Sequence, residues 1–349
     1  MFRCARLQLE IELLDDLAPR GYWGSRLRGG FGCGLLHRLC PKTDPRMASQ
    51  HDTCDCDYVR LFKPTQQNLG LQLVGRPLGG SANLPATFVV DPPAPTGYPR
   101  QGSRLSFGLT AIGPMCDYTR DCILAFEEFG KFGLDGRDHQ LARFRLVNVW
   151  DQFAGGRSIY VDGQAASAVV RSIADVAREV RASWSPEALS VAFQTNVRIQ
   201  NQRARLKDPR TGLALFSDFF DLVSNLAHRI ACLWQAYGND WPGRSEYQRS
   251  LDELLKASRR IEMQESDLEM RDLWGYSNLR DEPKDLRGFV GRMKFAGDFV
   301  PFLELLATGE IVHIGGETAN GLGKYAVAFP ANEAVQPESE KALLADCDR

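Results

Sequence analysis

Four glycines close together could bring backbone N–H groups against a phosphate. Gly315, Gly316, Gly321 and Gly323 lie in one loop between two segments that read as β-strands, and Lys324 ends the loop. Glycine has no Cβ and adopts positive φ readily, so successive N–H groups can turn toward an anion while the chain lies close to it. Glycines also serve simply to make tight connections. The pattern therefore leaves both a phosphate-binding loop and an ordinary turn open.

Basic residues near this loop could add positive charge for a polyanion. They are Arg287, Arg292, Lys294 and Lys324. The whole chain has 42 Lys plus Arg against 44 Asp plus Glu, a formal net charge of -2, so any surface for nucleic acid must be local. A solvated loop whose charge is balanced by acids elsewhere explains the same cluster equally well.

A second group of residues has the chemistry of a metal site. Cys40, His51, Cys54 and Cys56 lie close together in a segment with little apolar content. Thiolates and imidazole are the ligands of tetrahedral zinc, and a polar segment would gain order from the metal. The C-x-C spacing differs from the usual C-x₂-C, so reduced free thiols are the competing interpretation. The odd total of nine cysteines favours reduced thiols and a cytoplasmic location.

Two successive series of strands and helices must position these residues. In the first series the pattern predicts strands over 5–14, 71–75, 86–90, 104–112 and 142–150, with helices over 25–39 and 121–131. In the second it predicts strands over 189–199 and 288–298 and helices over 213–237 and 299–307, with a charged helical stretch over 246–271. The order βαββαβ predicts an α+β protein of two tandem ferredoxin-like (RRM-like) domains.

The expected domain boundaries follow from these elements. Residues 1–151 form the N-terminal domain, with a cysteine-containing insertion at about 40–58, and 188–330 form the C-terminal domain with the glycine-rich loop. Residues 152–187 are predicted to be a linker with a hairpin and a helix, and the acidic, alanine-rich 331–349 is predicted to be disordered. No segment approaches the roughly 20 apolar residues of a membrane helix, and the N-terminus has no apolar signal core, so we expect no membrane association.

Segments near both ends of the chain resemble one family. The strand 288–298, the stretch 302–312 and the loop 313–325 follow one another like that family's strand, "flplL.lGE" helix and "HiGk.t..GlGky" loop. The run from Arg28 through Cys40, Cys54 and Cys56 to Phe62 resembles its "lRGafG.aLr..vC…C..C…CpY..lF". The family is that of the CRISPR repeat-processing endoribonucleases, the sixth Cas family, within the RAMP superfamily. The resemblance spans about 26–330, with a divergent middle.

The resemblance implies a reaction in which RNA supplies its own nucleophile. A 2′-hydroxyl attacks the adjacent phosphate and leaves a 2′,3′-cyclic phosphate and a 5′-hydroxyl, without a metal. The protein must supply a base, an acid and positive charge at the phosphate, and histidine suits the first role because its unperturbed pKa is roughly 6.5. The family motif makes His37 the candidate base, with Tyr22 and Lys42 flanking the scissile phosphate as in some members. His313 stands where the family often has histidine and would either contact RNA or hold the loop.

The implied function is metal-independent cleavage of CRISPR repeat RNA (pre-crRNA) into guide units. No cofactor is expected for catalysis, and structural zinc stays open. The expected partners are the repeat RNA and other Cas effector subunits. The alternative is a non-catalytic RAMP subunit that holds a processed crRNA in an effector complex. Cutting of repeat RNA by the purified chain would separate the two.

Overall fold

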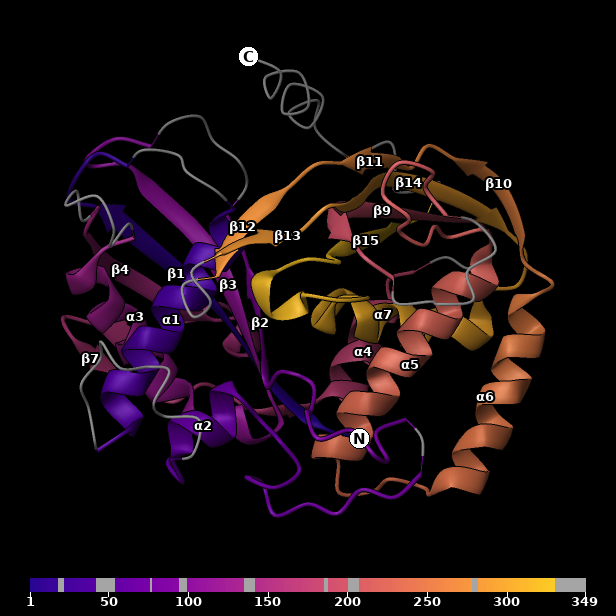
Figure 1. The fold of residues 1–349 in the computed structure, drawn as a ribbon, viewed down its shortest axis with the longest axis horizontal. Coiled ribbons are helices and arrows are strands. Elements are labelled where there is room, and N and C mark those ends of the chain that lie inside the picture. The colour runs from indigo at the N-terminus through magenta and orange to yellow at the C-terminus, as the bar shows by residue number, and fades with distance from the viewer. Residues whose placement is uncertain are drawn as a thin grey trace.

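The computed structural model describes residues 1–17, 22–41, 54–75, 77–93, 99–134, 142–184, 188–199, 207–277 and 282–329. These residues form two α+β halves that lie side by side, each with an antiparallel sheet and helices packed against it (Figure 1). The tail 331–349, which was predicted to be disordered, lies outside the described part of the chain.

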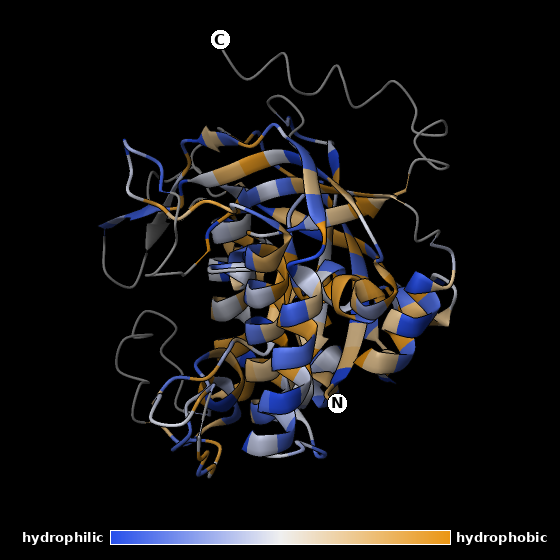
Figure 2. Ribbon diagram, turned by 90° about the vertical axis from the view of Figure 1, so that its right-hand side faces the viewer, coloured by the Kyte–Doolittle hydropathy of each residue, from blue (hydrophilic) through white to orange (hydrophobic). Residues whose placement is uncertain are grey.

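The N-terminal half has the strand order of a ferredoxin-like domain. Its sheet runs β2-β3-β1-β4, with helices α1 and α3 packed against each other. The elements are β1 (Arg3–Leu13), α1 (Trp23–Leu39), α2 (Asp57–Phe62), β2 (Phe88–Asp91), β3 (Arg104–Ile112), the 3₁₀ turn Gly113–Tyr118, α3 (Thr119–Phe132) and β4 (Phe144–Asp151). Alternate residues of β1 are buried, as the sequence alternation predicted, and Figure 2 shows polar and apolar residues alternating along the strands.

A series of short elements follows this half. They are the 3₁₀ turn Gln152–Ala154, β5 (Arg157–Ser158), β6 (Tyr160–Val161), β7 (Gln164–Ala165), β8 (Arg171–Ser172) and α4 (Ile173–Arg181). β6 and β7 make the expected hairpin, while β5 extends the first sheet beside β4 and β8 pairs with β1.

The C-terminal half repeats the same topology. Its sheet runs β10-β14-β9-β15, which is again the ferredoxin-like order. The elements are β9 (Ala188–Val197), α5 (Phe219–Tyr237), α6 (Arg244–Ser258), β10 (Glu262–Ser266), β11 (Glu269–Arg271), β12 (Trp274–Ser277), β13 (Glu282–Asp285), β14 (Gly288–Ala296), the 3₁₀ turn Val300–Phe302, α7 (Leu303–Val312), the 3₁₀ turn Thr318–Asn320 and β15 (Tyr325–Ala328). The predicted fold of two tandem ferredoxin-like domains is confirmed.

Several predicted elements were wrong in type or extent. The stretch 246–271 is helical only to Ser258, because β10 and β11 then pair with β14 at the sheet edge. The predicted strand 71–75 is irregular, and the helix expected from 213 begins at Phe219, where Asp218 accepts a hydrogen bond from the Asp221 N–H as its cap. The helix expected within the linker 152–187 spans Ile173–Arg181.

Helix α1 forms although glycine is a poor helix residue, because its glycines face another helix. A Cβ added at Gly34 would overlap the Ala125 carbonyl of α3, and one at Gly30 would overlap the Phe129 ring. The two helices therefore approach closely, and Phe31 stacks on Phe126 with ring centroids 4.9 Å apart. Packing thus offsets the cost of about 1 kcal/mol that each glycine carries in a helix.

A shared apolar cluster joins the two halves. It consists of Phe2, Cys4, Val89, Ile112, Ile173, Val176, Ile230, Leu233, Ile311 and Val312. These residues come from β1, β2, β3, α4, α5 and α7, so the halves form one packed body. The β12–β13 hairpin also extends from the C-terminal half toward α1 (Figure 1). Within the described ranges, no helix combines the length and the apolar character that a membrane crossing requires.

Candidate functional site

The glycine-rich loop lies at the junction between the halves. A Cβ added at Gly321 would lie 2.5 Å from the Val90 carbonyl oxygen of β2, and the Asn320 carbonyl lies against Gly24 at the start of α1. Residues 320–323 are therefore buried against the N-terminal half. Close approach of protein backbone, which only glycine permits, accounts for Gly321 here.

The loop's N–H groups divide into two sets. Those of Gly316, Gly321 and Gly323 donate to the carbonyls of Arg198, Thr318 and Asn196. Those glycine N–H groups cannot also cradle a phosphate, which corrects the sequence-based prediction. The remaining set lies at the partly exposed bend of the loop. Within the described ranges, the N–H groups of Gly315, Glu317, Thr318 and Ala319 have no hydrogen-bond partner.

His313 holds the loop from inside. Its side chain is 3% exposed, and Nδ1 lies 3.2 Å from the Leu322 carbonyl oxygen, to which an Nδ1–H donates. Burial lowers the pKa of His313 to about 4, so the ring is neutral near pH 7. The prediction that His313 contacts RNA conflicts with this burial, whereas its alternative role of holding the loop fits the hydrogen bond.

Two ion pairs tie the loop to its surroundings. Lys324 Nζ lies 2.8 Å from Asp91 at the end of β2, across the junction. Lys284 of the hairpin lies 2.6 Å from Glu317, whose carboxylate also accepts a bond from the Asn320 side chain at 2.6 Å. Asp91, Lys284 and Glu317 were not among the residues predicted from the sequence. None of them lies in a segment with a recognisable charge pattern.

The other predicted basic residues also have acidic neighbours. Arg287 pairs with Asp285 at 3.0 Å, and its guanidinium lies 5.3 Å from the centroid of the Trp274 ring, which is 51% exposed. Lys294 pairs with Glu265 at 3.0 Å. The backbone N–H of Arg292 donates to Asp267. The charges of Arg287 and Lys294 are therefore partly offset, and an RNA phosphate would have to compete with carboxylates for them.

His37 lies in the last turn of α1, on the outside of the N-terminal half. Its side chain is 43% exposed, and Nδ1 lies 3.9 Å from a Glu128 carboxylate oxygen of α3. The Phe132 ring meets it edge-on with centroids 6.0 Å apart. An exposed imidazole with a carboxylate beside it is accessible to a substrate hydroxyl, which a general base requires.

Tyr22 and His37 lie at opposite ends of α1. Fifteen residues at 1.5 Å per residue separate them by about 22 Å, so they do not flank one phosphate. Tyr22 lies instead against the glycine-rich loop, where burial raises the pKa of its hydroxyl. Among the described residues, that hydroxyl has no hydrogen-bond partner. The third member of the predicted set, Lys42, lies outside the described residues.

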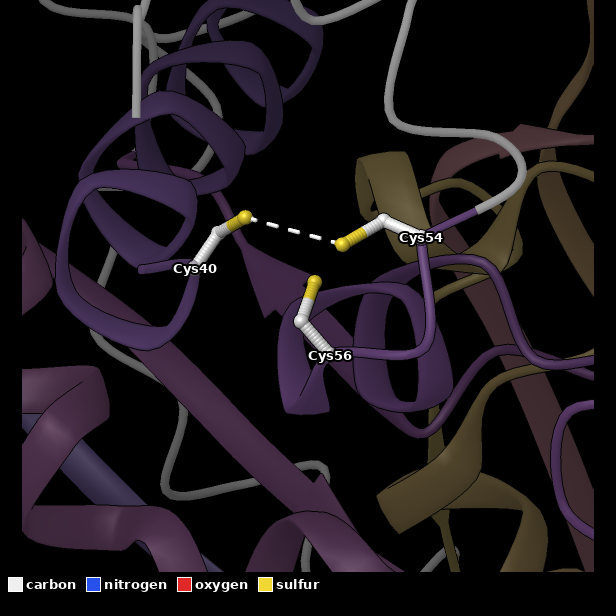
Figure 3. Close-up of side chains that lie close together, drawn as sticks. All are labelled: Cys40, Cys54 and Cys56. Carbon is white, nitrogen blue, oxygen red and sulfur yellow. Dashed lines mark hydrogen bonds between the residues drawn. The ribbon is translucent and has the colours of Figure 1, made fainter. Parts of the chain in front are cut away.

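Three of the four predicted metal ligands come together at the far end of α1. Cys40 is the residue after the helix, and Cys54 and Cys56 lead into α2. Their Sγ atoms lie within 4.8 Å of one another and point into a common space (Figure 3). Burial raises the pKa of Cys56 to about 11. His51, the fourth predicted ligand, lies outside the described residues.

Comparisons with known proteins agree with this fold. Residues 191–325 match the family model for the CRISPR-associated endoribonuclease Cas6, and residues 2–173 match a model described as an N-terminal domain, AF_1859_N. No curated protein sequence matches.

Solved structures match nearly the full length. A Cas6 product complex of Thermus thermophilus has a TM-score of 0.51 at 15% identity, covering 93% of this chain and 99% of that one. A partial Cas6-RT-Cas1–Cas2 complex has a TM-score of 0.52 at 13% identity, covering 94% of this chain and 46% of the other. Identities this low speak for the fold alone. Residues 191–325 thus resemble the Cas6 endoribonuclease family in sequence, and the chain has the fold of the solved Cas6 structures over nearly its full length.

Proposed function

We propose that this protein is a metal-independent endoribonuclease that cuts CRISPR repeat RNA into guide units. The observation that carries the proposal is the Cas6 domain at 191–325, whose glycine-rich loop is built into the junction of two ferredoxin-like halves. The 2′-hydroxyl would attack the adjacent phosphate, giving a 2′,3′-cyclic phosphate and a 5′-hydroxyl. Such a reaction needs a base, an acid and charge at the phosphate.

His37 is the base in this proposal, as the family motif implies, and the Glu128 carboxylate lies beside it. His313 is a poor candidate because it is buried and its pKa is lowered to about 4. His228 is exposed on α5, 3.7 Å from the Cys232 sulfur, and desolvation lowers its pKa, but it lies outside the N-terminal motif. The protonated ring would return the proton to the leaving 5′-oxygen, and Lys42 would add charge at the phosphate.

The RNA would lie along α1, because the base and the loop are at its opposite ends. The N–H groups of Gly315, Glu317, Thr318 and Ala319, which have no partner among the described residues, would hold backbone phosphates several nucleotides from the scissile bond, together with Lys284. Binding and cutting would thus depend on different residues. Changes near the loop should weaken RNA binding, and changes at His37 should slow the chemical step.

A histidine scan on the full chain tests the assignment. His37→Ala should lower single-turnover cleavage by about 10²–10⁴-fold, the usual loss for a general base, with RNA affinity nearly unchanged. Arg38→Ala is the matched control, because Arg38 lies on the same turn but pairs with Asp121 at 2.9 Å. It should cut at the wild-type rate. Wild-type cleavage by His37→Ala, with loss in His51→Ala or His139→Ala, would move the base to one of those residues.

The rival function predicts a different result for the wild-type chain. A non-catalytic RAMP subunit would bind repeat RNA and keep it intact. Repeat RNA retained uncut after long incubation with stoichiometric protein would therefore overturn the proposed activity itself, beyond the choice of base.

A further inference from the structure

We propose that Cys40, Cys54 and Cys56 form a zinc site that fastens the end of α1 to the start of α2. The three sulfurs come from two segments separated by thirteen residues of chain, yet all lie within 4.8 Å of one another. Their side chains point toward one another from the end of α1 and the start of α2 (Figure 3).

The spacing of the sulfurs fits a tetrahedral metal. Zinc–sulfur bonds of about 2.3 Å at tetrahedral angles put two sulfurs about 3.8 Å apart. The Sγ atoms of Cys40 and Cys54 are 3.9 Å apart. A disulfide would require about 2 Å. The present separation therefore suits a shared metal and no bond between the sulfurs.

The surroundings also favour a metal. Cys40 and Cys56 are buried and Cys54 is half-buried, so the space between them is closed to bulk water on most sides. Soft thiolates in such a space select zinc over the hard cations that prefer oxygen. Three thiolates leave one position of a tetrahedral ion, which water would fill. Among the described residues, no acidic or histidine side chain joins the cluster.

The consequence of the site is local order. Cys40 ends α1 and Cys56 is the N-cap residue of α2, so one ion would fix two helix ends at once. His37 is three residues before Cys40, and its turn would be held in place. This inference does not rest on the proposed nuclease activity, because metal binding can be measured without RNA.

The test measures zinc bound by the full chain, purified under reducing conditions, by inductively coupled plasma mass spectrometry. Wild type should carry about one zinc per chain, and Cys54→Ser and Cys56→Ser should lose at least about nine-tenths of it. Cys33→Ser is the matched control, since Cys33 is an exposed cysteine of α1 outside the cluster. It should keep the wild-type content. Circular dichroism of each variant shows whether the fold is retained.

A second measurement uses wild type alone. Its melting temperature should rise with added Zn²⁺ and fall with a strong chelator, because a ligand that binds only the folded state stabilises it. Bound Co²⁺ should show a sulfur-to-cobalt charge-transfer band that Cys54→Ser lacks. Equal zinc in wild type and Cys54→Ser, no zinc in wild type, or a Cys40–Cys54 disulfide in freshly purified protein would each overturn the site.

Discussion

Replacing Gly323 by alanine should destabilise the whole protein, because the glycine is enclosed by its own loop. Its φ is 73°, a conformation that costs an L-residue about 1–2 kcal/mol. A Cβ there would lie 1.8 Å from the Ile314 carbonyl oxygen, and overpacking of this kind typically costs about 1–3 kcal/mol. The backbone shift would also strain the bonds from Gly323 N to Asn196 O at 2.9 Å and from Ile314 N to Gly323 O at 3.0 Å. We expect a loss of about 3–5 kcal/mol in the free energy of unfolding.

Gly212→Ala separates the cost of the positive φ from the cost of the steric overlap. Gly212 has nearly the same φ, 69°, but a Cβ there meets no atom within 4 Å. It should therefore lose only the conformational cost of about 1–2 kcal/mol. Urea unfolding followed by circular dichroism measures both variants against wild type. Equal losses for Gly323→Ala and Gly212→Ala would show that the loop has room for a side chain, and would refute the packing described for this junction.

Three further changes test other parts of the structure. Burial raises the pKa of Glu310 to about 7 from 4.5, so the folded protein binds this proton more tightly than the unfolded chain. Wild type should therefore lose about 3 kcal/mol of stability relative to Glu310→Gln as the pH rises from 4.5 to above 7. Urea unfolding at each pH measures this difference, and the same pH dependence in both proteins would contradict it. Tyr22→Phe removes a buried hydroxyl that has no partner, so melting temperature and single-turnover cleavage rate should both stay near wild type; a hundredfold slower rate would return Tyr22 to the catalytic set. A double-mutant cycle of Lys324→Met and Asp91→Asn should give a coupling energy of about 0.5–3 kcal/mol across the junction, and a coupling near zero would mean that the pair does not join the halves.

Strong local patterns made most of the fold predictable. The strand 104–112 has the bounds that alternation indicated. The helix predicted over 121–131 spans Thr119–Phe132 in the structure, only a few residues more. The strand β10 was missed because its residues, Glu262–Ser266, are all exposed and, apart from Met263, polar. Such a strand exists through its pairing with β14, and the sequence of a fully exposed edge strand carries no apolar alternation to reveal it.

The site was less predictable, for two different reasons. The glycine pattern indicated a loop whose backbone lies very close to another group. Whether that group is protein backbone or an RNA phosphate depends on which residues pack against the loop in the folded protein. Val90 lies far away in sequence, so nothing local could indicate it. The separation of Tyr22 from His37 was available from the sequence, however. A helix predicted over 25–39 already places its two ends some 20 Å apart.

Cleavage of a repeat RNA carrying a single 2′-deoxy nucleotide before the scissile bond tests whether the 2′-hydroxyl is the nucleophile. The unmodified RNA should be cut in excess EDTA, with a 2′,3′-cyclic phosphate on the upstream fragment and a 5′-hydroxyl on the downstream fragment. The deoxy RNA should bind with nearly the same affinity and remain uncut, because only the attacking group is missing and the phosphate contacts remain. Cutting of the deoxy RNA, or a requirement for Mg²⁺, would contradict the mechanism.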